Sequence, residues 1–485
     1  MSEYSNVERP FLQKLEEIGW EIIDHGGGPD HPTDPTISRR MSFGEVAIRS
    51  HFKKWVGKIN SWATDEQLDW AYDKITTQTG PLVEANRQVF DWVRKGLPLP
   101  GKNEVTGEEN PTLKLVDFRP GHFNDNGFLA INQFRVDTPA MAKAYIVPDI
   151  VCVVNGLPWV VIECKDLDVA EPLSDAWEQI RRYSNQRKDP DDSYAQDEGK
   201  ESLFHANLFN VITHGTEARF GTITGEFDYY YNWTDIFPEK YRTVETQDGG
   251  VRQEVMIGGM FNKEILLDIL KNFTLFTTKG GNLVKIVCRY NQYRAVGKMI
   301  ERLRKGGDFK GRSGVVWHTQ GSGKSLSMVF LVRKMRDSFD LAGWKIMIVV
   351  DRNELEEQIE DDAVLTDEGV TVVESKAELE KLGGDTANLN LVMIHKFGVS
   401  SKEELERWKR LGIPPKFEVF GEINNREKVL ILVDEAHRSQ GGDMAKNLFI
   451  AFPNATRIGF TGTPLLTPRH KIGRASCRER VSVAV

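Results

Sequence analysis

The feature that most constrains this chain of 485 residues is a pair of short motifs set far apart. The first is the glycine-rich run His318–Ser325, which follows the apolar run Val315–Trp317. The second is Asp434-Glu435, which directly follows the apolar run Val429–Val433. A glycine-rich turn between a strand and a helix directs backbone amides at a phosphate, and a carboxylate at a strand end can hold a divalent ion. The pair predicts a nucleotide-binding α/β unit.

Each residue in the two motifs has a chemical reason for its place. Glycines let the backbone approach a phosphate, and the helix that follows adds the positive end of its dipole. We expect Lys324 to contact the phosphates of ATP, and Ser325 and Asp434 to hold Mg²⁺. We expect Glu435 to polarise the water that attacks the nucleotide during hydrolysis. The side-chain amide of Gln292, upstream of the loop, is suited to recognise the adenine base. The residues expected to bind the nucleotide are Gln292, Thr319, Gln320, Gly321, Ser322, Gly323, Lys324, Ser325 and Asp434.

A second group of charged residues lies in the first half of the chain. Asp149 follows a proline, and Glu163-Cys-Lys165 ends a run rich in valine and isoleucine. Residues two apart on a strand point to the same face, so Glu163 and Lys165 share one. Metal-dependent cleavage of a phosphodiester requires carboxylates to hold the ion and a cation for the developing charge. We therefore predict Asp149 and Glu163 as metal ligands and, with Lys165, as catalytic residues.

The turn at Asn155-Gly156 sets a condition on this prediction. A two-residue turn alone would pair Asp149 with Ile162 and direct the aspartate to the wrong face of the sheet. An odd-numbered loop or a β-bulge would instead set Asp149 opposite Glu163. We expect one of these two arrangements. For the triplet alone, the simpler interpretation is ordinary charged side chains on a half-exposed strand.

Further positions favour the catalytic interpretation. Pro148 precedes the aspartate, and Gln179 and Tyr183 form a Gln-x-x-x-Tyr element on a predicted helix. Glu45, on a helix predicted over Glu45–Val56, could supply another acid. We include Gln179, Tyr183 and Glu45 among the catalytic candidates, with packing or helix capping as the alternative role of each.

Composition narrows the class of protein. Hydrophobic residues make up 40% and charged residues 28%, as in ordinary globular domains. The net charge of −8 argues against a wholly basic nucleic-acid binder but leaves room for a local basic groove. The four cysteines form no Cys-x-x-Cys pair, which argues against a zinc site and fits a reducing, cytoplasmic location. No run approaches the ~20 apolar residues that a membrane span needs.

The sequence pattern changes along the chain and predicts an α/β protein with two domains. We expect the first domain over 1–250, with strands within 144–165 and 202–233. Over 251–471, five buried-strand runs alternate with helical stretches, which indicates a parallel sheet with helices on both faces. We place the boundary near 235–260.

These motifs together resemble those of a known family. Residues 285–466 resemble the first motor domain of superfamily 2 helicases and translocases, and the acid–lysine set resembles PD-(D/E)xK nucleases of the RecB type. A nuclease ahead of such a motor resembles the R subunit of type I restriction enzymes, in which a histidine like His318 is typical at the loop start. The resemblance covers roughly residues 10–470. It implies ATP and Mg²⁺ as cofactors, cleavage of unmodified double-stranded DNA, and modification (methyltransferase) and specificity subunits as partners.

The same resemblance implies a second motor domain, which we expect to be missing after Leu466. Residues 472–485 show no regular period and look like a reading frame of a sequencing adapter. We therefore expect a C-terminally truncated copy with a non-native tail and impaired ATP turnover. The alternatives are a single-chain restriction–modification enzyme, a helicase–nuclease fragment, or a non-catalytic remnant that binds DNA or sibling subunits.

Overall fold

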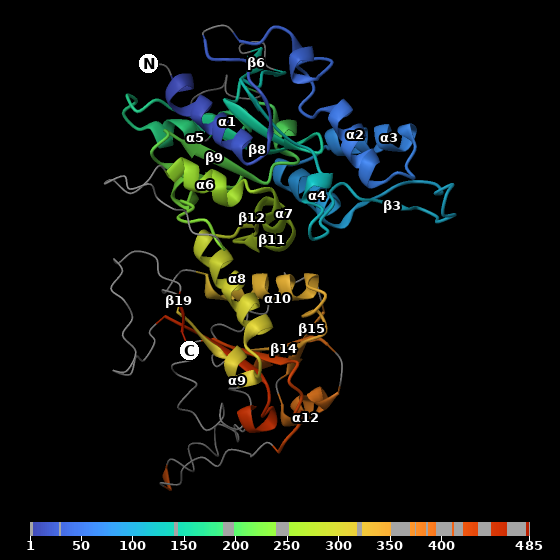
Figure 1. Cartoon of the computed structure of the whole chain (residues 1–485), viewed down its shortest axis with the longest axis vertical. Coiled ribbons are helices and arrows are strands. Elements are labelled where there is room, and N and C mark those ends of the chain that lie inside the picture. The colour runs from blue at the N-terminus through green and yellow to red at the C-terminus, as the bar shows by residue number, and fades with distance from the viewer. Residues whose placement is uncertain are drawn as a thin grey trace. The chain divides into compact units, whose positions relative to one another are not determined.

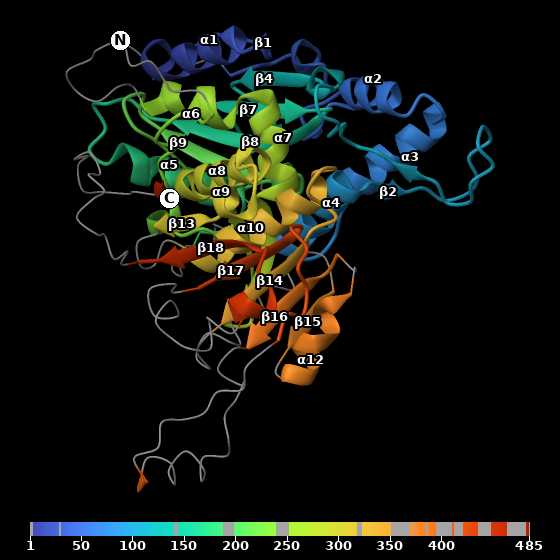
Figure 2. The same cartoon turned by 60° about the horizontal axis from the view of Figure 1, so that its bottom comes forward.

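The computed structural model divides the chain into two units, Met1–Tyr290 and Asn291–Val485, and each is described by itself (Figures 1 and 2). The residues that the structure describes are 3–28, 31–139, 144–187, 198–238, 252–317, 323–350, 369–373, 375–384, 387–393, 410–411, 421–434, 448–462 and 482–484.

The first unit is built on a mixed sheet of six strands in the order β1-β4-β7-β8-β9-β10. The pairs β1–β4 and β8–β9 are parallel, and the other neighbours are antiparallel. The strands are β1 (Glu21–Ile23), β4 (Phe128–Asn132), β7 (Ile150–Val154), β8 (Leu157–Cys164), β9 (Phe209–Thr213) and β10 (Ala218–Gly221). The strands predicted within 144–165 and 202–233 are therefore present.

Helices cover both faces of this sheet (Figure 2). On one face, four apolar side chains of α5 (Pro172–Tyr183) join the core formed by the middle strands. On the other, Phe11 of α1 (Arg9–Glu17) packs edge-on against Phe261, which also contacts Phe209 of β9. Each fully buried side chain of this kind contributes about 1.5–3 kcal/mol, so the central strands are fixed between two apolar layers.

The remaining elements of the first unit surround this core. Its helices are η1 (Tyr4–Glu8), η2 (Pro35–Ser38), α2 (Arg49–Ile59), α3 (Asp65–Thr76), α4 (Leu82–Lys95), η3 (Phe123–Asp125), η4 (Glu201–Phe204), η5 (Phe227–Tyr229), α6 (Arg252–Met260) and α7 (Lys263–Asn272). Its short strand pairs are β2 (Leu97–Pro98) with β3 (Thr112–Leu113), β5 (Val136–Asp137) with β6 (Tyr145–Ile146), and β11 (Thr274–Lys279) with β12 (Asn282–Val287).

The domain boundary expected near 235–260 lies inside the first unit of the structure. The segment after it packs back onto the N-terminal residues. Trp20 donates a hydrogen bond from its indole Nε1 to the carbonyl of Phe261 at 2.9 Å. This packing joins residues of low and high number in one core, which the change in sequence pattern does not reveal.

The second unit contains a seven-stranded sheet in the order β15-β16-β14-β17-β18-β13-β19. All neighbours are parallel except β13 and β19, which confirms the predicted α/β class with a parallel sheet. The strands are β13 (Gly314–Trp317), β14 (Lys345–Val350), β15 (Val370–Val373), β16 (Leu389–Met393), β17 (Val429–Val433), β18 (Thr456–Thr461) and β19 (Ser482–Ala484). The five predicted strand runs correspond to β13, β14, β16, β17 and β18.

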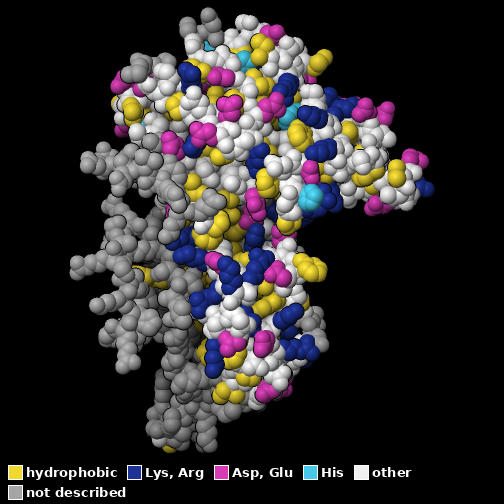
Figure 3. All heavy atoms as spheres, in the orientation of Figure 1, with side chains coloured by type: hydrophobic (Ala, Val, Ile, Leu, Met, Phe, Trp, Pro, Cys, Tyr) yellow, Lys and Arg dark blue, Asp and Glu magenta, His cyan; other side chains and the backbone are white. Residues whose placement is uncertain are grey.

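The helices of the second unit connect and cover these strands. They are α8 (Tyr290–Lys305), α9 (Phe309–Arg312), α10 (Lys324–Asp337), α12 (Lys376–Glu380) and η7 (Lys381–Gly383). Lys and Arg side chains gather over the face where α8 lies (Figure 3). Across the described parts of both units, the helices all lack the length and apolarity needed to traverse a bilayer.

Candidate functional site

The hairpin β7–β8 determines which residues meet at its open end. Its register pairs Ile150 with Ile162, and the turn Asn155-Gly156 is followed by a β-bulge that shifts the pairing by one residue. One step further along, this register sets Asp149 opposite Glu163. The structure thus combines the tight turn with a bulge, and the prediction that one of the two corrections would be present is confirmed.

Asp149, Glu163 and Lys165 form a hydrogen-bonded cluster at this end of the sheet. Lys165 Nζ donates to Glu163 Oε1 at 2.7 Å and to the carbonyl of Cys164 at 2.9 Å. The backbone N–H of Cys164 donates to Asp149 Oδ2 at 2.7 Å. Every residue of β8 is buried. The simpler interpretation, in which these are ordinary side chains of a half-exposed strand, is therefore wrong.

The electrostatics of the cluster suit a divalent cation. Burial raises the pKa of Asp149 well above its ordinary value, and the charge of Glu163 adds to this. Burial also raises the pKa of Glu163, although Lys165 opposes the shift. Burial lowers the pKa of Lys165, but the carboxylates outweigh it and hold the pKa above its ordinary value. Within the described part of the chain, the buried Glu163 Oε2 has no hydrogen-bond partner. A cation would stabilise the charged form of both carboxylates.

Two N-terminal carboxylates, of Glu3 and Glu8, adjoin the cluster, and neither was predicted from the sequence. Carboxylate oxygens of Glu3, Glu8 and Asp149 all lie within 4.8 Å of one another, a spacing that fits ligands around one ion. Burial raises the pKa of Glu8 to about 7, although hydrogen bonds from Gln133 and Asn132 oppose the shift. A signal for Glu8 was present in the sequence, because it lies on the apolar face of the first helical segment.

That signal follows from helical spacing. Glu8 precedes the buried residues Phe11, Leu12 and Leu15 of α1 by three, four and seven positions, which is the spacing of one helix face. Glu8 itself ends the π-helical turn η1, a geometry often found at functional sites. An acidic residue on an otherwise apolar face is worth attention as a candidate ligand.

Glu45 has a different position from the one predicted. The helix expected over Glu45–Val56 begins only at Arg49, because the N–H of Ile48 donates to the carbonyl of Gly156 outside the helix. The carboxylate of Glu45 accepts a hydrogen bond from the N–H of Met41 at 2.8 Å, and its carbonyl accepts one from Arg40. In the structure Glu8, not Glu45, brings an early acidic side chain to Asp149.

Gln179 and Tyr183 come to the cluster from α5. Gln179 Nε2 donates to the hydroxyl of Tyr183 at 2.6 Å, and that hydroxyl donates to the carbonyl of Val147 at 3.1 Å. Burial raises the pKa of Tyr183, and the charges of Glu163 and Asp149 add to this. The element therefore attaches α5 to the segment that carries Asp149.

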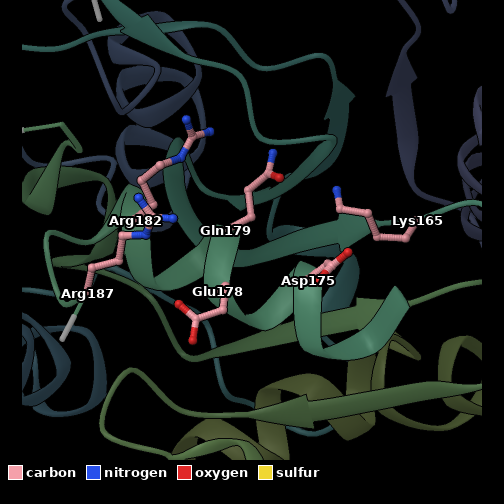
Figure 4. Close-up of a pocket in the computed structure, with 6 residues that line it drawn as sticks. All are labelled: Lys165, Asp175, Glu178, Gln179, Arg182 and Arg187. Carbon is pink, nitrogen blue, oxygen red and sulfur yellow. The ribbon is translucent and has the colours of Figure 1, made fainter. Parts of the chain in front are cut away.

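A cavity of about 480 Å³ opens beside this cluster (Figure 4). It is lined by Lys165, Asp175, Glu178, Gln179, Arg182 and Arg187. The head groups of Lys165, Gln179 and Arg182 point to one side of α5, whereas Glu178 points to the other (Figure 4). Donor groups in a row next to buried carboxylates can contact a polyanion while the carboxylates hold a cation.

In the second unit, the end of the phosphate loop can be described from Gly323 onward. Thr319, Gln320, Gly321 and Ser322 lie outside the described residues. Gly323 has φ of +75°, and a β-carbon there would meet Gln292 Nε2 at 2.5 Å. Gln292 Nε2 donates to the carbonyl of Gly323 at 3.1 Å. The positive φ therefore favours glycine here, and the amide of Gln292 contacts the loop backbone.

The lysine and the aspartate of the two motifs meet. Lys324 Nζ lies 4.0 Å from Asp434 Oδ1. The strands that precede these two residues, β13 and β17, are separated by β18 in the sheet. Ser325 lies in the first turn of α10, beside Lys324. Glu435 lies outside the described residues. The carboxyl ends of parallel strands meet at one sheet edge, which explains how motifs far apart in sequence come together.

Two family models match the chain. Residues 1–229 match the model described as the N terminus of type I restriction enzyme R proteins. Residues 291–477 match the model described as SWI2/SNF2 ATPase. The first range contains the cluster around Asp149 and Glu163, and the second contains Lys324 and Asp434.

Curated relatives agree with the family models. The HindI endonuclease subunit of a type I restriction enzyme from Haemophilus influenzae is 29% identical, over 95% of this chain and 42% of the relative. The SsaAORF53P endonuclease subunit of a type I restriction enzyme from Staphylococcus saprophyticus is 26% identical, over 74% of this chain and 34% of the relative. The chain thus spans about two-fifths of the length of the first of them.

A solved structure also aligns with part of the chain. The SWI2/SNF2 ATPase core of Sulfolobus solfataricus in complex with double-stranded DNA covers 40% of this chain and 34% of its own, at 16% identity and a TM-score of 0.25. That similarity is too low to bear on mechanism. The family models and curated relatives confirm the resemblance found in the sequence: residues 1–229 are similar to the N termini of type I restriction enzyme R proteins, and residues 291–477 are similar to SWI2/SNF2 ATPases.

Proposed function

We propose that this chain is part of the R subunit of a type I restriction–modification system, which couples ATP-dependent DNA translocation to Mg²⁺-dependent cleavage of unmodified double-stranded DNA. The observation that carries the proposal is the cluster of Asp149, Glu163 and Lys165, with Lys165 Nζ 2.7 Å from Glu163, in the same chain as a phosphate-loop lysine. A nuclease of the PD-(D/E)xK type and a nucleotide-driven motor in one chain fit this function.

In the nuclease unit, Asp149, Glu163 and Glu8 would hold Mg²⁺, whose role is to activate water and stabilise charge on the phosphate. Lys165 remains protonated because two carboxylates surround it, so it is available to stabilise the developing negative charge. Glu163 orients that ammonium through the 2.7 Å hydrogen bond. Tyr183 and Gln179 keep α5 against the site, and the cavity along α5 leaves room for the DNA strand.

In the second unit, Lys324 would contact the phosphates of ATP, and Ser325 and Asp434 would hold the accompanying Mg²⁺. The loop residues Thr319–Ser322 and the acid Glu435 keep the roles expected from the sequence. The 4.0 Å separation of Lys324 and Asp434 supports this assignment, because both must lie near the same β- and γ-phosphates.

The proposed binding partners of this chain are those of a type I restriction–modification system. A type I assembly contains modification (methyltransferase) and specificity subunits, and we propose these as partners together with double-stranded DNA. The H. influenzae relative is named as the endonuclease subunit of such an enzyme. Recognition of a DNA sequence would then belong to another subunit, while this chain supplies cleavage and motion.

The proposal is tested by combining two readouts. The chain alone, without nucleotide, should bind Mn²⁺, and Glu163→Gln should remove that binding, because the substitution removes a charged ligand from the cluster. In a full-length R subunit assembled with modification and specificity subunits, the unsubstituted segment should support cleavage of unmodified duplex DNA in ATP and Mg²⁺, and Glu163→Gln should not. Cleavage that persists in Glu163→Gln would contradict the nuclease assignment.

A further inference from the structure

Gln133 lies beside the carboxylate cluster and has an unusual backbone conformation for its residue type. Its φ is 47°, in the left-handed region that residues other than glycine adopt only at a cost in free energy. It directly follows β4, and its N–H donates to the carbonyl of Asp149 at 2.7 Å. The N–H of Phe134 then donates to the carbonyl of Pro148 at 2.9 Å. This turn therefore fixes the chain after β4 to the segment that carries Asp149.

From this position the side-chain amide of Gln133 reaches Glu8. Gln133 Nε2 lies 3.2 Å from Glu8 Oε1 and 3.1 Å from Glu8 Oε2, and the two residues are 125 positions apart in the sequence. A second amide, of Asn132, is more distant: its Nδ2 lies 3.5 Å from Glu8 Oε2, at the limit of a hydrogen bond. Glu8 is 2% exposed, so water contributes little to holding its carboxylate.

We propose that Gln133 is a positioning residue, which sets the carboxylate of Glu8 beside Asp149 so that both can bind one divalent ion. The inference rests on the proposed nuclease function and adds a residue that no motif contains. The backbone of Gln133 is tied to Asp149 and its side chain to Glu8, so one residue couples the positions of two ligands. Residues that orient a ligand in this way typically contribute 10–100-fold to metal affinity.

The backbone conformation separates this role from simple packing. If position 133 served only the turn after β4, glycine would serve it better, because glycine adopts positive φ without a steric cost. The chain instead has a long amide side chain at a left-handed position. Its contact with Glu8 is the interaction that glycine could not provide.

The substitution Gln133→Gly tests the role directly. Glycine keeps the turn and removes the amide; relief of the left-handed conformation opposes the greater freedom of glycine in the unfolded chain, so the midpoint of thermal unfolding without metal should change little. The affinity of the full 485-residue chain for Mn²⁺, measured by calorimetry without nucleotide, should fall roughly 10-fold. Gln133→Asn tolerates the same φ and keeps a shorter amide, so its affinity should lie between the two. An unchanged affinity in Gln133→Gly would overturn the proposal.

A double substitution tests whether Gln133 acts through Glu8. In a Glu8→Gln chain, Gln133→Gly should weaken Mn²⁺ binding no further, because the group that it positions is already neutral. An equal additional loss in both backgrounds would overturn the proposal. Asp149→Asn distinguishes failure of the proposed nuclease site from failure of the positioning role of Gln133. If it leaves Mn²⁺ affinity unchanged, the nuclease site is wrong; if it abolishes binding while Gln133→Gly has no effect, only the positioning role fails.

Discussion

Each unit has a lysine next to a carboxylate, but the two pairs differ in their separation and in the number of acidic groups around them. Lys165 lies 2.7 Å from Glu163, and three further carboxyl groups, of Glu3, Glu8 and Asp149, adjoin that pair. Lys324 lies 4.0 Å from Asp434. In the first unit the acidic groups near the lysine outnumber it, whereas among the described residues of the two motifs in the second unit one lysine faces one aspartate.

From this difference we expect the two proposed sites to bind a metal ion in different ways. An excess of buried carboxylates binds a divalent cation from solution, since the cation supplies the charge that the cluster lacks. A lysine beside a single aspartate has little attraction for a free cation, so we expect Mg²⁺ to enter there with the phosphates of the nucleotide. We therefore expect the first site to bind metal alone and the second to bind it as the nucleotide complex.

The largest expected effects come from reciprocal lysine substitutions in the assembled enzyme. Lys165→Ala should reduce DNA cleavage by roughly 10²–10³-fold or more, because it removes the cation that stabilises the transition state, and it should leave ATP hydrolysis intact. Lys324→Ala should abolish ATP hydrolysis and the cleavage that depends on translocation. Lys324→Ala should also leave Mn²⁺ binding by the first unit unchanged without nucleotide. Loss of Mn²⁺ binding in Lys324→Ala would contradict the expectation that the first unit binds the metal ion independently of the second.

A glycine substitution tests how strongly the first site depends on the β7–β8 turn. Gly156 has φ of +85°, and an added β-carbon would meet the nitrogen of Phe52 at 2.6 Å. Gly156→Ala should destabilise the first unit by about 2–4 kcal/mol and weaken Mn²⁺ binding, as seen by calorimetric unfolding with and without metal. Gly281→Ala is the matched control, with φ of +81° and nothing within 4 Å, and it should cost only about 1–2 kcal/mol. Equal costs at both positions would mean that the close approach at Gly156 is unimportant.

The effect of pH follows from Glu8. Its folded-state pKa is raised from 4.5 to about 7, chiefly by burial. Without metal, the folded state keeps a proton that the unfolded chain releases between these values, so the stability of the first unit falls as pH rises through this window. Mn²⁺ binds the deprotonated carboxylates and should therefore raise the unfolding midpoint by more at about pH 8 than at about pH 5.5. A metal-induced shift that is the same at both pH values would exclude a proton-linked site.

The smallest expected effect concerns DNA contact along α5. The guanidinium groups of Arg181 and Arg182 lie over the rings of Trp177 and Tyr183, respectively, but of the two only Arg182 lines the cavity beside Lys165. If Arg182 contacts a phosphate, Arg182→Ala should lower the slope of log affinity against log salt concentration by about 0.9, measured with duplex DNA in Ca²⁺. Arg181→Ala removes the same charge and should leave the slope unchanged. Equal changes in both variants would indicate general electrostatic attraction instead of a contact in the cavity.

The local motifs could be predicted because their chemistry lies in short segments. Helix α10 begins at Lys324 and β17 ends at Val433, next to the positions that the motifs marked. The set of Asp149, Glu163 and Lys165 is also local, since one hairpin joins it. The required register correction could be stated in advance because side chains alternate strictly along a strand.

Other parts of the site depend on contacts between distant segments. Glu45 was chosen from a helical pattern, but a hydrogen bond from Ile48 to the distant Gly156 delays the start of that helix. Glu8 reaches Asp149 because α1 packs on the sheet, and Gln133 reaches Glu8 across 125 positions. No local pattern encodes which distant partner a buried polar side chain will meet.

The sequence by itself determined the chemical groups, the α/β character and the two pairs of motifs, because these depend on residue type and on spacing within a strand or a turn. Only the tertiary structure shows which acidic groups lie close together and which backbone segments hold them there. The physical reason is burial: carboxylates lose their water only when helices close over the sheet, and only then do the nearest charges and amides control their protonation and orientation.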